Sequence, residues 1–557
     1  MKLKTKFCSS LAKIMPADGP EIETKKGCAL RGERFSFQMA YRIEDEWRGM
    51  MSLEVESPFG QRLRVRKVEL VPVEYTGVSF DDDIISRSPG MYPDRLSEFS
   101  PEENWAPALP YWRAVWFTVD IPADWKPGEY EIKVTPSCFW AFDQECGPHT
   151  EFDAKTFTLE VLDEVLPPQK LINTHWFYAD CLATHYNVPV FSEEHWRIIG
   201  NFMKSAADHG INMILTPVFT PPLDTLPGTE RPTVQLVDVT YSRGKYSFDL
   251  AKLERWIKLA QKCGMKYFEI SHLFTQWGAE FTPKIIAKVN GKEKRIFGWD
   301  VKANSKEYRE FLDAFLPVLA DFLKKKRLQN KTYFHCSDEP QFKHLENYKS
   351  AKAMLEKHLK GFHIMDALSS VDFYKQGIVT TPVPSESHLE DFLAAGMKER
   401  WTYYCCGPTV TFSNRFIHMP SARNRIFGTL LYVHDIEGFL HWGFNFYYSG
   451  LSRHQIDPFR TNDSGYFFPS GDGFLLYPGK NGEPEDSIRY EVFHEALQDQ
   501  RVLEKLESYI GREKIQKELD KLSPSGKMKI DEYPKGEKAV MAVRNKINQL
   551  LRKAIKG

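Results

Sequence analysis

The spacing of apolar residues changes near residue 165. Before that point, short stretches alternate apolar and polar side chains, which is the period of a half-buried β-strand. Clear examples are residues 35–41, 113–121 and 126–134, the last of which contains a Pro-Gly turn. Short strands separated by turn residues, with no helical period between them, predict a β-sandwich domain over residues 1–165.

From residue 170 onward, apolar stretches of strand length alternate with amphipathic stretches of helix length. The predicted strands are residues 172–177, 212–216, 267–271, 332–336, 362–367, 378–380, 401–405 and 438–442. The predicted helices are residues 193–209, 250–263, 306–325, 346–360, 389–395, 422–432 and 488–506. About eight strand–helix units in this order predict a (β/α)8 TIM barrel over residues 170–508, and therefore an α/β fold class. The Lys- and Glu-rich residues 509–557 predict a short C-terminal helical segment.

Two adjacent acids end one of the predicted barrel strands. The strand at 332–336 is followed by Ser337, Asp338 and Glu339, and Pro340 then opens a helix-like stretch. Ligands of α/β proteins bind at the carboxyl ends of strands. The alternative is that the acids only cap the following helix, but capping needs a single acid. Because neighbouring carboxylates repel each other, the pair indicates a catalytic site.

Aromatic and polar side chains follow other predicted strands as well. They occur in residues 175–180, 216–222, 270–277, 403–408 and 441–447. Flat apolar faces beside hydroxyl-binding groups are typical of a sugar pocket. Each aromatic residue taken alone is more often part of a core, so the interpretation depends on the whole set.

Charge and motif content exclude several functions. Lys and Arg number 74 and Asp and Glu 75, so the net charge of −1 indicates neither a nucleic acid nor an anionic membrane as partner. The sequence has no nucleotide-binding glycine loop, no HxH, HExxH or CxxC spacing and no GxSxG turn. We therefore expect no cofactor and no metal. The histidines His175, His272, His335 and His441 have no metal-ligand spacing.

The N-terminus is basic but has no apolar segment of about 7–15 residues like that of a signal peptide. No stretch approaches the roughly 18 apolar residues of a membrane helix. These features predict a cytoplasmic protein, and the nine cysteines, which have no regular spacing, are expected to be reduced thiols.

Several segments together resemble glycoside hydrolase family 123, the β-N-acetylgalactosaminidases, and its uncharacterised relatives. In the barrel half these are residues 175–182, 212–217, 337–340, 438–442, 471–479 and 487–491. Residues 29–38 and 126–130 resemble the β-sandwich of the same family. The resemblance covers nearly the whole chain except its C-terminal tail.

The resemblance implies a hydrolase of carbohydrate metabolism that releases terminal β-linked N-acetylgalactosamine from an amino-sugar glycan or glycoconjugate. The implied mechanism is retaining and substrate-assisted: the 2-acetamido oxygen attacks the anomeric carbon and forms an oxazoline. Glu339 would be the acid and base, and Asp338 would hold the acetamido N–H. The implied contacts to the acetamido group and sugar ring are Tyr403, Trp442 and Asn445. The candidates for polar contacts to an axial hydroxyl are His175, Asp180, His272, Trp277 and Asp472.

Two alternatives stay open at this point. One is another barrel glycosidase, of β-hexosaminidase or β-galactosidase type, in which Asp338 or Glu339 is paired with a separate carboxylate such as Glu269 or Asp366. The other is a non-catalytic sugar-binding protein on the same fold, although a binding protein has no need of the acid pair. The sequence does not predict the aglycone, a preference between the two N-acetylhexosamines, or an oligomeric state.

Overall fold

The computed structural model describes residues 2–44, 49–77, 80–81, 83–99, 106–139 and 150–556. Their contacts divide the chain into two compact units. The first unit comprises Met1–Gln169, Thr409–His434 and Glu485–Gly557, and the second comprises Lys170–Pro408 and Asp435–Pro484. The predicted division into residues 1–165, 170–508 and 509–557 follows other boundaries and stays a prediction.

The first unit contains two largely antiparallel sheets. One sheet has the order β1 (Leu3–Ser9), β3 (Arg34–Ile43), β8 (Arg113–Asp120), β5 (Leu63–Val73), β6 (Gly90–Glu98). The other has the order β2 (Lys26–Arg31), β11 (Lys155–Val165), β9 (Gly128–Phe139), β4 (Gly49–Glu56), β7 (Ala106–Ala108), with β10 (Thr150–Glu151) paired to β9. Only β2 and β11 run parallel among these described pairs. The strands predicted at 35–41, 113–121 and 126–134 are confirmed as β3, β8 and β9.

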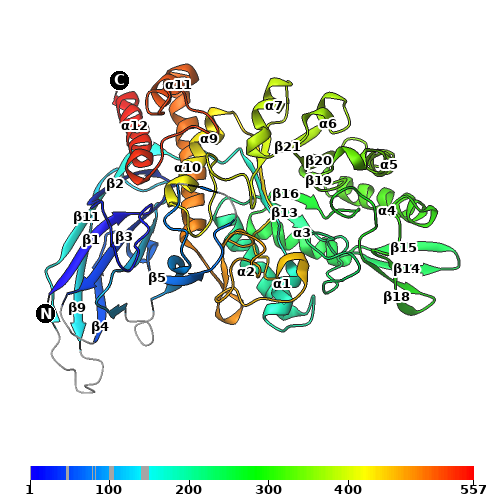
Figure 1. The fold of residues 1–557 in the computed structure, drawn as a ribbon, viewed down its shortest axis with the longest axis horizontal. Helices are drawn as coiled ribbons and strands as arrows, with labels where there is room; N and C mark the ends of the chain where they lie inside the picture. Colours follow the sequence, from blue (N-terminus) through cyan, green and yellow to red (C-terminus); the bar gives the residue numbers. More distant parts are fainter. Residues whose placement is uncertain are drawn as a thin grey trace. The chain divides into compact units, whose positions relative to one another are not determined.

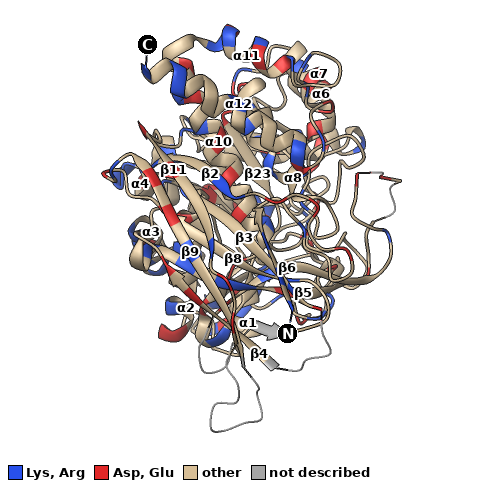
Figure 2. Cartoon of the chain, turned by 90° about the vertical axis from the view of Figure 1, so that its left-hand side faces the viewer, with Lys and Arg blue, Asp and Glu red and all other residues tan. Residues whose placement is uncertain are grey.

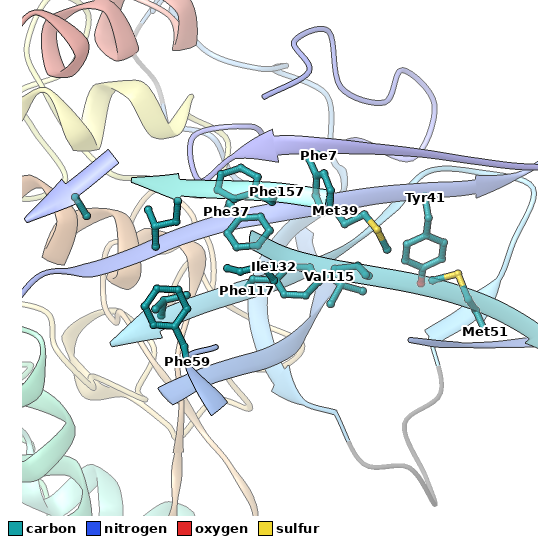
Figure 3. Close-up of a cluster of buried hydrophobic side chains, with 14 of the residues drawn as sticks. Phe7, Phe37, Met39, Tyr41, Met51, Phe59, Val115, Phe117, Ile132 and Phe157 are labelled. Carbon is teal, nitrogen blue, oxygen red and sulfur yellow. The ribbon is translucent and has the colours of Figure 1, made fainter. Parts of the chain in front are cut away.

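Aromatic side chains from both sheets form one core (Figure 3). The ring of Phe37 on β3 stacks on Phe117 of β8 at 4.8 Å and on Phe157 of β11 at 4.0 Å. Phe7 of β1 meets Phe157 edge-on at 5.7 Å. Alternation along each strand places these side chains on the face toward the other sheet. Burial of each such ring stabilises the unit by roughly 1.5–3 kcal/mol.

The described residues of the first unit include five α-helices: α8 (Ser421–Arg425), α9 (Phe427–Val433), α10 (Ile488–Ile510), α11 (Arg512–Asp520) and α12 (Glu537–Lys556). Helix α10 packs on α8, α9, α11 and α12 and on strands β3 and β6. Two fully buried ion pairs join α10 to the first sheet, Glu491 with Arg66 at 2.5 Å and Arg489 with Asp94 at 2.9 Å. These contacts explain why α10, which was predicted as the last barrel helix, groups with the N-terminal sheets.

Glycine allows α9 and α10 to approach closely. A Cβ placed at Gly428 of α9 would lie 1.7 Å from the carbonyl oxygen of Ala496 on α10. No side chain can occupy that position without separating the two helices.

The second unit is a nearly closed barrel of eight parallel strands with helices between them. The strand order is β21 (Thr381–Pro384), β20 (His363–Leu368), β19 (Thr332–Phe334), β16 (Tyr267–Ile270), β13 (Met213–Thr216), β12 (Ile172–His175), β23 (Gly438–His441), β22 (Trp401–Tyr403). Figure 1 labels β21, β20, β19, β16 and β13 of this sheet. A parallel bridge between Ser385 and Tyr403 brings the two ends of this order together.

Seven of the predicted barrel strands overlap the observed ones. The strand predicted at 378–380 was misplaced, because the strand that pairs with β20 is Thr381–Pro384. Its sequence contains Pro382 and Pro384, and proline normally argues against a strand because it has no N–H to donate. Here the strand stands at one end of the sheet order, an edge position where proline is tolerated.

The helices that connect the strands of the second unit are α1 (Ala179–His185), α2 (Glu193–Asp208), α3 (Ala251–Cys263), α4 (Lys306–Lys325), α5 (Leu345–Glu356), α6 (Val371–Lys375) and α7 (Leu389–Ala394). Ser192 and Ser305 cap α2 and α4, each accepting a backbone N–H of the first turn. Helix α3 ends at Gly264, whose φ of 111° suits only glycine. Two short strands, β24 (Tyr477–Pro478) and β25 (Pro484–Glu485), lie farther along the chain.

A four-stranded sheet is inserted in the barrel and was not predicted. Its order is β15 (Lys245–Asp249), β14 (Asp238–Ser242), β17 (Ile285–Val289), β18 (Lys292–Phe297). Arg243 and Gly244 form the turn between β14 and β15 with φ of 51° and 77°. Positive φ at both residues is typical of a two-residue hairpin. In the sequence, the glycine at 244 between two stretches that alternate polar and apolar residues was the available indication.

Charges of both signs are interspersed in the part of the chain that Figure 2 shows, with Lys and Arg next to Asp and Glu along the helices. None of the described helices combines the length and the apolar character needed to cross a membrane.

Candidate active site

The carboxyl ends of the barrel strands and the loops that follow them line one cavity of about 190 Å³. This is several times the roughly 30 Å³ share of a water molecule, so an organic ligand fits. The aromatic lining residues are Trp176, Tyr178, Trp277, Tyr403, Trp442, Phe467 and Phe468. The carboxyl groups are Asp224, Asp338 and Glu339, and the remaining lining residues include Gln276, Cys405 and Cys406.

The backbone of the acid pair is fixed by the loops on either side. The carbonyl oxygen of Asp338 accepts the N–H of Trp277 at 2.8 Å, and the N–H of Glu339 donates to Ala367 at 3.0 Å. Glu339 has a φ of 45°. A residue other than glycine in this region costs on the order of 1–3 kcal/mol, and such strain is concentrated at functional sites. The turn after β19 therefore holds both acids in a specific, strained arrangement.

Tyr403 at the end of β22 holds the carboxyl group of Glu339. Its hydroxyl donates a hydrogen bond of 2.6 Å to Oε1 of Glu339. Burial, followed by the nearby Glu339, raises the pKa of the Tyr403 phenol well above its ordinary value. The phenol is therefore a hydrogen-bond donor at every pH of interest.

The environment of Asp338 favours its neutral form. Burial is the largest cause that raises the pKa of Asp338 well above the ordinary aspartate value, and the carboxyl group of Glu339 adds to it. His335 acts in the opposite direction. Asp338 consequently keeps its proton at pH values where an exposed aspartate has lost it.

A buried imidazolium just after β19 lies between two carboxylates from the neighbouring strands β16 and β20. Nε2 of His335 is 2.5 Å from Glu269, and Nδ1 is 3.6 Å from Asp366. Burial disfavours the charged imidazole, but the nearby carboxylate of Asp366 and the hydrogen bond to Glu269 outweigh it and raise the pKa of His335 to about 10. The ring is therefore a cation in the neutral pH range.

The two carboxylates of this network have further donors. Glu269 accepts from the Thr174 hydroxyl at 2.5 Å and from the Trp176 indole at 2.7 Å. Asp366 accepts from the backbone N–H groups of Cys336 and Ser337 at 2.9 and 3.0 Å. The Asp366 bonds anchor the segment that leads into the acid pair. Neither Glu269 nor Asp366 lines the cavity.

A model of the glycoside hydrolase 123 catalytic domain matches residues 176–506. The chain belongs to glycoside hydrolase family 123. The resemblance seen in the sequence is confirmed, and the protein is a glycosidase that acts on a glycan substrate.

A solved structure supports the fold of this family 123 enzyme. It is a family 123 glycoside hydrolase from Clostridium perfringens, described in terms of glycolipid glycan hydrolysis. The two share 15% identity with a TM-score of 0.72, and the alignment covers 100% of this chain and 99% of the other. A family 10 xylanase with a bacterial Ig-like domain, from termite gut, aligns over 86% of this chain and 100% of its own at 10% identity. Its TM-score of 0.30 is too low to indicate a shared fold. No curated protein matches by sequence.

Three of the predicted sugar contacts of the family 123 enzyme line the cavity together with the acid pair: Trp277, Tyr403 and Trp442. The indole of Trp442 donates to Asp472 at 3.0 Å, and the Trp442 ring packs on Phe468 at 4.6 Å. Asp472 is 2% exposed and is not part of the lining, so it fixes the Trp442 ring from behind.

The remaining predicted contacts are buried outside the lining. His272 stacks on His335 with ring centres 4.2 Å apart, and burial holds its pKa well below the usual value. The ring of His175 lies between Phe439 and His441. Asp180 is 3.4 Å from the guanidinium of Arg231.

Asn445 is also outside the lining. Its amide accepts the N–H of Tyr178 at 2.8 Å and donates to the carbonyl oxygen of the same residue at 3.1 Å. These two hydrogen bonds between the Asn445 side chain and the Tyr178 backbone position Tyr178, which does line the cavity. The direct sugar contact predicted for Asn445 remains a prediction.

Asp224 is a cavity residue that the sequence analysis missed. It lies in the loop after β13, has a φ of 41°, and donates its N–H to the Gln276 side chain at 2.6 Å. Its Oδ2 accepts the N–H of Leu451 at 3.0 Å. Burial is the largest cause that raises the pKa of Asp224 to about 6, and Arg231 opposes it. The sequence evidence was an acid shortly after a predicted strand, in a proline-rich loop.

Phe467 and Phe468 were missed as well. They come from the long stretch after β23, far along the chain from the strand end. An adjacent pair of phenylalanines in a loop was the local indication, because binding residues are often found on loops.

Proposed function

We propose that this enzyme releases terminal β-linked N-acetylgalactosamine with net retention, using the substrate's own acetamido group as nucleophile. The observation that supports this best is the placement of Asp338 and Glu339, adjacent acids from one turn, in a single cavity. Neither adjacent acid has to reach the opposite face of the sugar if the nucleophile comes from the substrate. Glu269 and Asp366, the other acids considered, are fully buried and held by several donors.

In the proposed first step the acetamido oxygen attacks the anomeric carbon and the bond to the leaving oxygen breaks. Glu339 gives that oxygen a proton, while Asp338 accepts the acetamido N–H and offsets the positive charge of the oxazoline ring. In the second step Glu339 takes a proton from water, and the water attacks the anomeric carbon and opens the ring. Two inversions at one carbon give retention.

The hydrogen bond from Tyr403 supports the role of Glu339. It occupies Oε1 at 2.6 Å and leaves the other carboxyl oxygen for the proton transfer. A carboxyl group held in one orientation loses less entropy when it reaches the leaving oxygen.

The aromatic walls support a sugar substrate. Trp277 is 44% exposed, and its indole lines the cavity next to the acid pair. An exposed indole presents a flat apolar face to ligands, and such faces stack on the apolar side of pyranose rings. Trp442 offers a second face, which Asp472 fixes.

We also propose that the substrate is the glycan of a glycoconjugate. The structural neighbour from Clostridium perfringens is described in terms of glycolipid glycans, which supports this class. The proposed chemistry uses no metal, so a chelator should leave the rate unchanged. Loss of activity on chelation, restored by one divalent ion, would contradict it.

Asp224 favours a second candidate, a β-hexosaminidase or β-galactosidase that uses a separate carboxylate nucleophile. It is the one further carboxyl group among the described lining residues. One oxygen of this carboxyl group, Oδ2, is however already occupied by the N–H of Leu451 at 3.0 Å. We therefore favour Asp224 as a hydrogen-bonding group.

Nitrophenyl β-glycosides of N-acetylgalactosamine, N-acetylglucosamine and galactose test both candidates. We expect turnover of the acetamido sugars only, and strong inhibition by a thiazoline mimic, which should bind at least about 10²-fold tighter than substrate. Equal turnover of the galactoside, with no effect of the thiazoline, would overturn substrate assistance. In that event Asp224→Ala should be inactive and recover with azide to give a glycosyl azide.

A further inference from the structure

Two adjacent thiols form part of the cavity wall. Cys405 and Cys406 follow β22 and line the same cavity as Glu339 and Tyr403. Their sulfur atoms are 3.8 Å apart. Cys406 is exposed and Cys405 is half-buried, so reagents can reach the pair from the cavity. The other described cysteines are buried or half-buried.

We propose that Cys405 and Cys406 are a reversible modification site, a vicinal dithiol whose oxidation by a peroxide closes a disulfide and switches the hydrolase off. The proposal rests on the proposed function, because it acts on the same cavity. It concerns residues to which the hydrolytic mechanism assigns no role.

The reaction balances with one hydrogen peroxide. The sulfur of Cys406 attacks one peroxide oxygen, the O–O bond breaks, and a sulfenic acid and one water form. The sulfur of Cys405 then attacks the sulfur of Cys406, the S–O bond breaks, and a second water leaves with the remaining thiol proton. Two thiols and one peroxide give one disulfide and two waters.

The environment assigns the first step to Cys406. The hydrogen bond to Cys406, followed by burial, raises the pKa of Cys405 well above that of an ordinary thiol. Cys405 therefore stays protonated and reacts second, after Cys406 has become an electrophile. The exposure of Cys406 also makes it the sulfur that peroxide meets first.

Formation of this disulfide has to move the backbone. The peptide bond fixes neighbouring Cα atoms about 3.8 Å apart, closer than the about 4.4–6.8 Å that disulfides usually span, so closing the ring strains it and has to twist the backbone torsions of both residues. The N–H of Cys405 bonds to Gly407 at 2.9 Å, which fixes the present turn. Tyr403 lies only two residues earlier and holds Glu339. Rearrangement at the cysteines therefore reaches the catalytic acid.

The same geometry accounts for reversibility. A disulfide between adjacent residues is strained, and strained or exposed disulfides are the ones that thiols reduce easily. A dithiol reductant should restore both the turn and the bond from Tyr403 to Glu339.

The test uses the full-length enzyme, first reduced and then treated with graded hydrogen peroxide. We expect the peptide containing residues 405 and 406 to lose two hydrogen atoms by mass. Hydrolysis should fall at least about tenfold, the effect of losing one hydrogen bond to a charged group. Dithiothreitol should restore the rate. Cys405→Ser and Cys406→Ser, each compared with its own untreated rate, should resist this reversible loss, whereas Cys263→Ser should respond as wild type does.

A trivalent arsenical gives a second, independent measurement. Phenylarsine oxide condenses with two neighbouring thiols and releases one water. We expect one arsenical per enzyme at residues 405 and 406, none in either serine variant, and removal by a dithiol but not by a monothiol. Absence of both the disulfide and the arsenical adduct would overturn the proposal, as would a mapped disulfide with an unchanged rate.

These readouts separate the two proposals. If the N-acetylgalactosaminide is not hydrolysed, the proposed function fails, but the mass and arsenical results still decide whether the dithiol exists. Inhibition is then measured on whichever nitrophenyl glycoside the enzyme turns over. Equal inhibition of wild type and both serine variants would show that oxidation acts elsewhere.

Discussion

The hydroxyl of Tyr403 donates a 2.6 Å hydrogen bond to Oε1 of Glu339, and it does so across the seam of the barrel. Glu339 follows β19, whereas Tyr403 ends β22, which meets β21 at this seam. The proposed acid is therefore positioned by a strand that lies far from its own in the sheet order.

Tyr403→Phe removes the bond and keeps the ring. We expect kcat to fall about 10–100-fold, since a hydrogen bond to a charged group contributes about 1.5–3 kcal/mol. KM should change little if the phenol only orients Glu339. Steady-state kinetics on a nitrophenyl β-N-acetylgalactosaminide measures both constants. The matched control is Tyr374→Phe, whose hydroxyl bonds only a loop carbonyl at Gly396. Equal losses in the two variants would contradict the orienting role.

Substitutions of the two acids should slow hydrolysis of different sets of substrates. Glu339→Gln should slow substrates with poor leaving groups by several orders of magnitude and nitrophenyl substrates much less, because an activated phenol departs with little protonation. Asp338→Asn should slow every substrate, since acetamido participation is needed whatever the leaving group. A plot of log kcat/KM against leaving-group pKa distinguishes the two slopes. The same steep slope for both variants would argue against separate roles.

Activity should require the ionised form of Asp338. Its pKa is raised in the folded enzyme, so the carboxylate is lost as the pH falls through a value above the ordinary one of about 4. We therefore expect the acid limb of kcat/KM to lie above pH 4. A pH profile of wild type and Asp224→Asn identifies the titrating group, because Asp224 has a pKa of about 6. An acid limb that stays at or below pH 4 in both proteins would contradict the prediction.

Asp224 should lower stability at neutral pH. Its pKa is about 6 in the folded state and about 3.9 in an unfolded chain, so the folded state binds the proton more tightly. Its contribution to stability is then present below pH 4 and lost as the pH rises through 6. Asp224→Asn should raise the free energy of unfolding at pH 8 by about 1–3 kcal/mol, and by less at pH 5. Urea unfolding at the two pH values measures this difference, and a larger gain at pH 5 would refute the sign.

Gly428→Ala should destabilise the first unit. The added methyl would lie 1.7 Å from the carbonyl oxygen of Ala496, so α9 and α10 have to separate. Overpacking of this kind costs about 1–3 kcal/mol or more. The control is Gly200→Ala in α2, where the methyl meets Leu259 at 3.4 Å and helix propensity improves. Urea midpoints of the two variants should move in opposite directions.

The acid pair could be predicted from sequence because its evidence is local. A strand, two acids and a proline are neighbours in the chain, and their order already indicates the end of a barrel strand. Trp277, Tyr403 and Trp442 were found in the same way, one strand end at a time. The family resemblance then added the expected mechanism.

Asp224 and Phe468 could not be found this way. Each reaches the cavity from a loop whose path depends on distant contacts, such as the bond from Leu451 to Asp224. Asn445 shows the reverse case. It has the residue type and position of a sugar contact, yet its amide is occupied by the backbone of Tyr178. A polar residue at a strand end can thus face a ligand or a neighbouring loop, and local sequence does not distinguish the two.

The imidazolium of His335 between Glu269 and Asp366 also affects the electrostatic potential near the acid pair. One positive and two negative groups leave an excess of one negative charge near the acid pair, in surroundings that water screens poorly. Such a field stabilises the cationic sugar ring that develops as the glycosidic bond breaks. It also repels acidic sugars, so terminal residues that carry a carboxylate should be excluded before any contact with the aromatic walls is made.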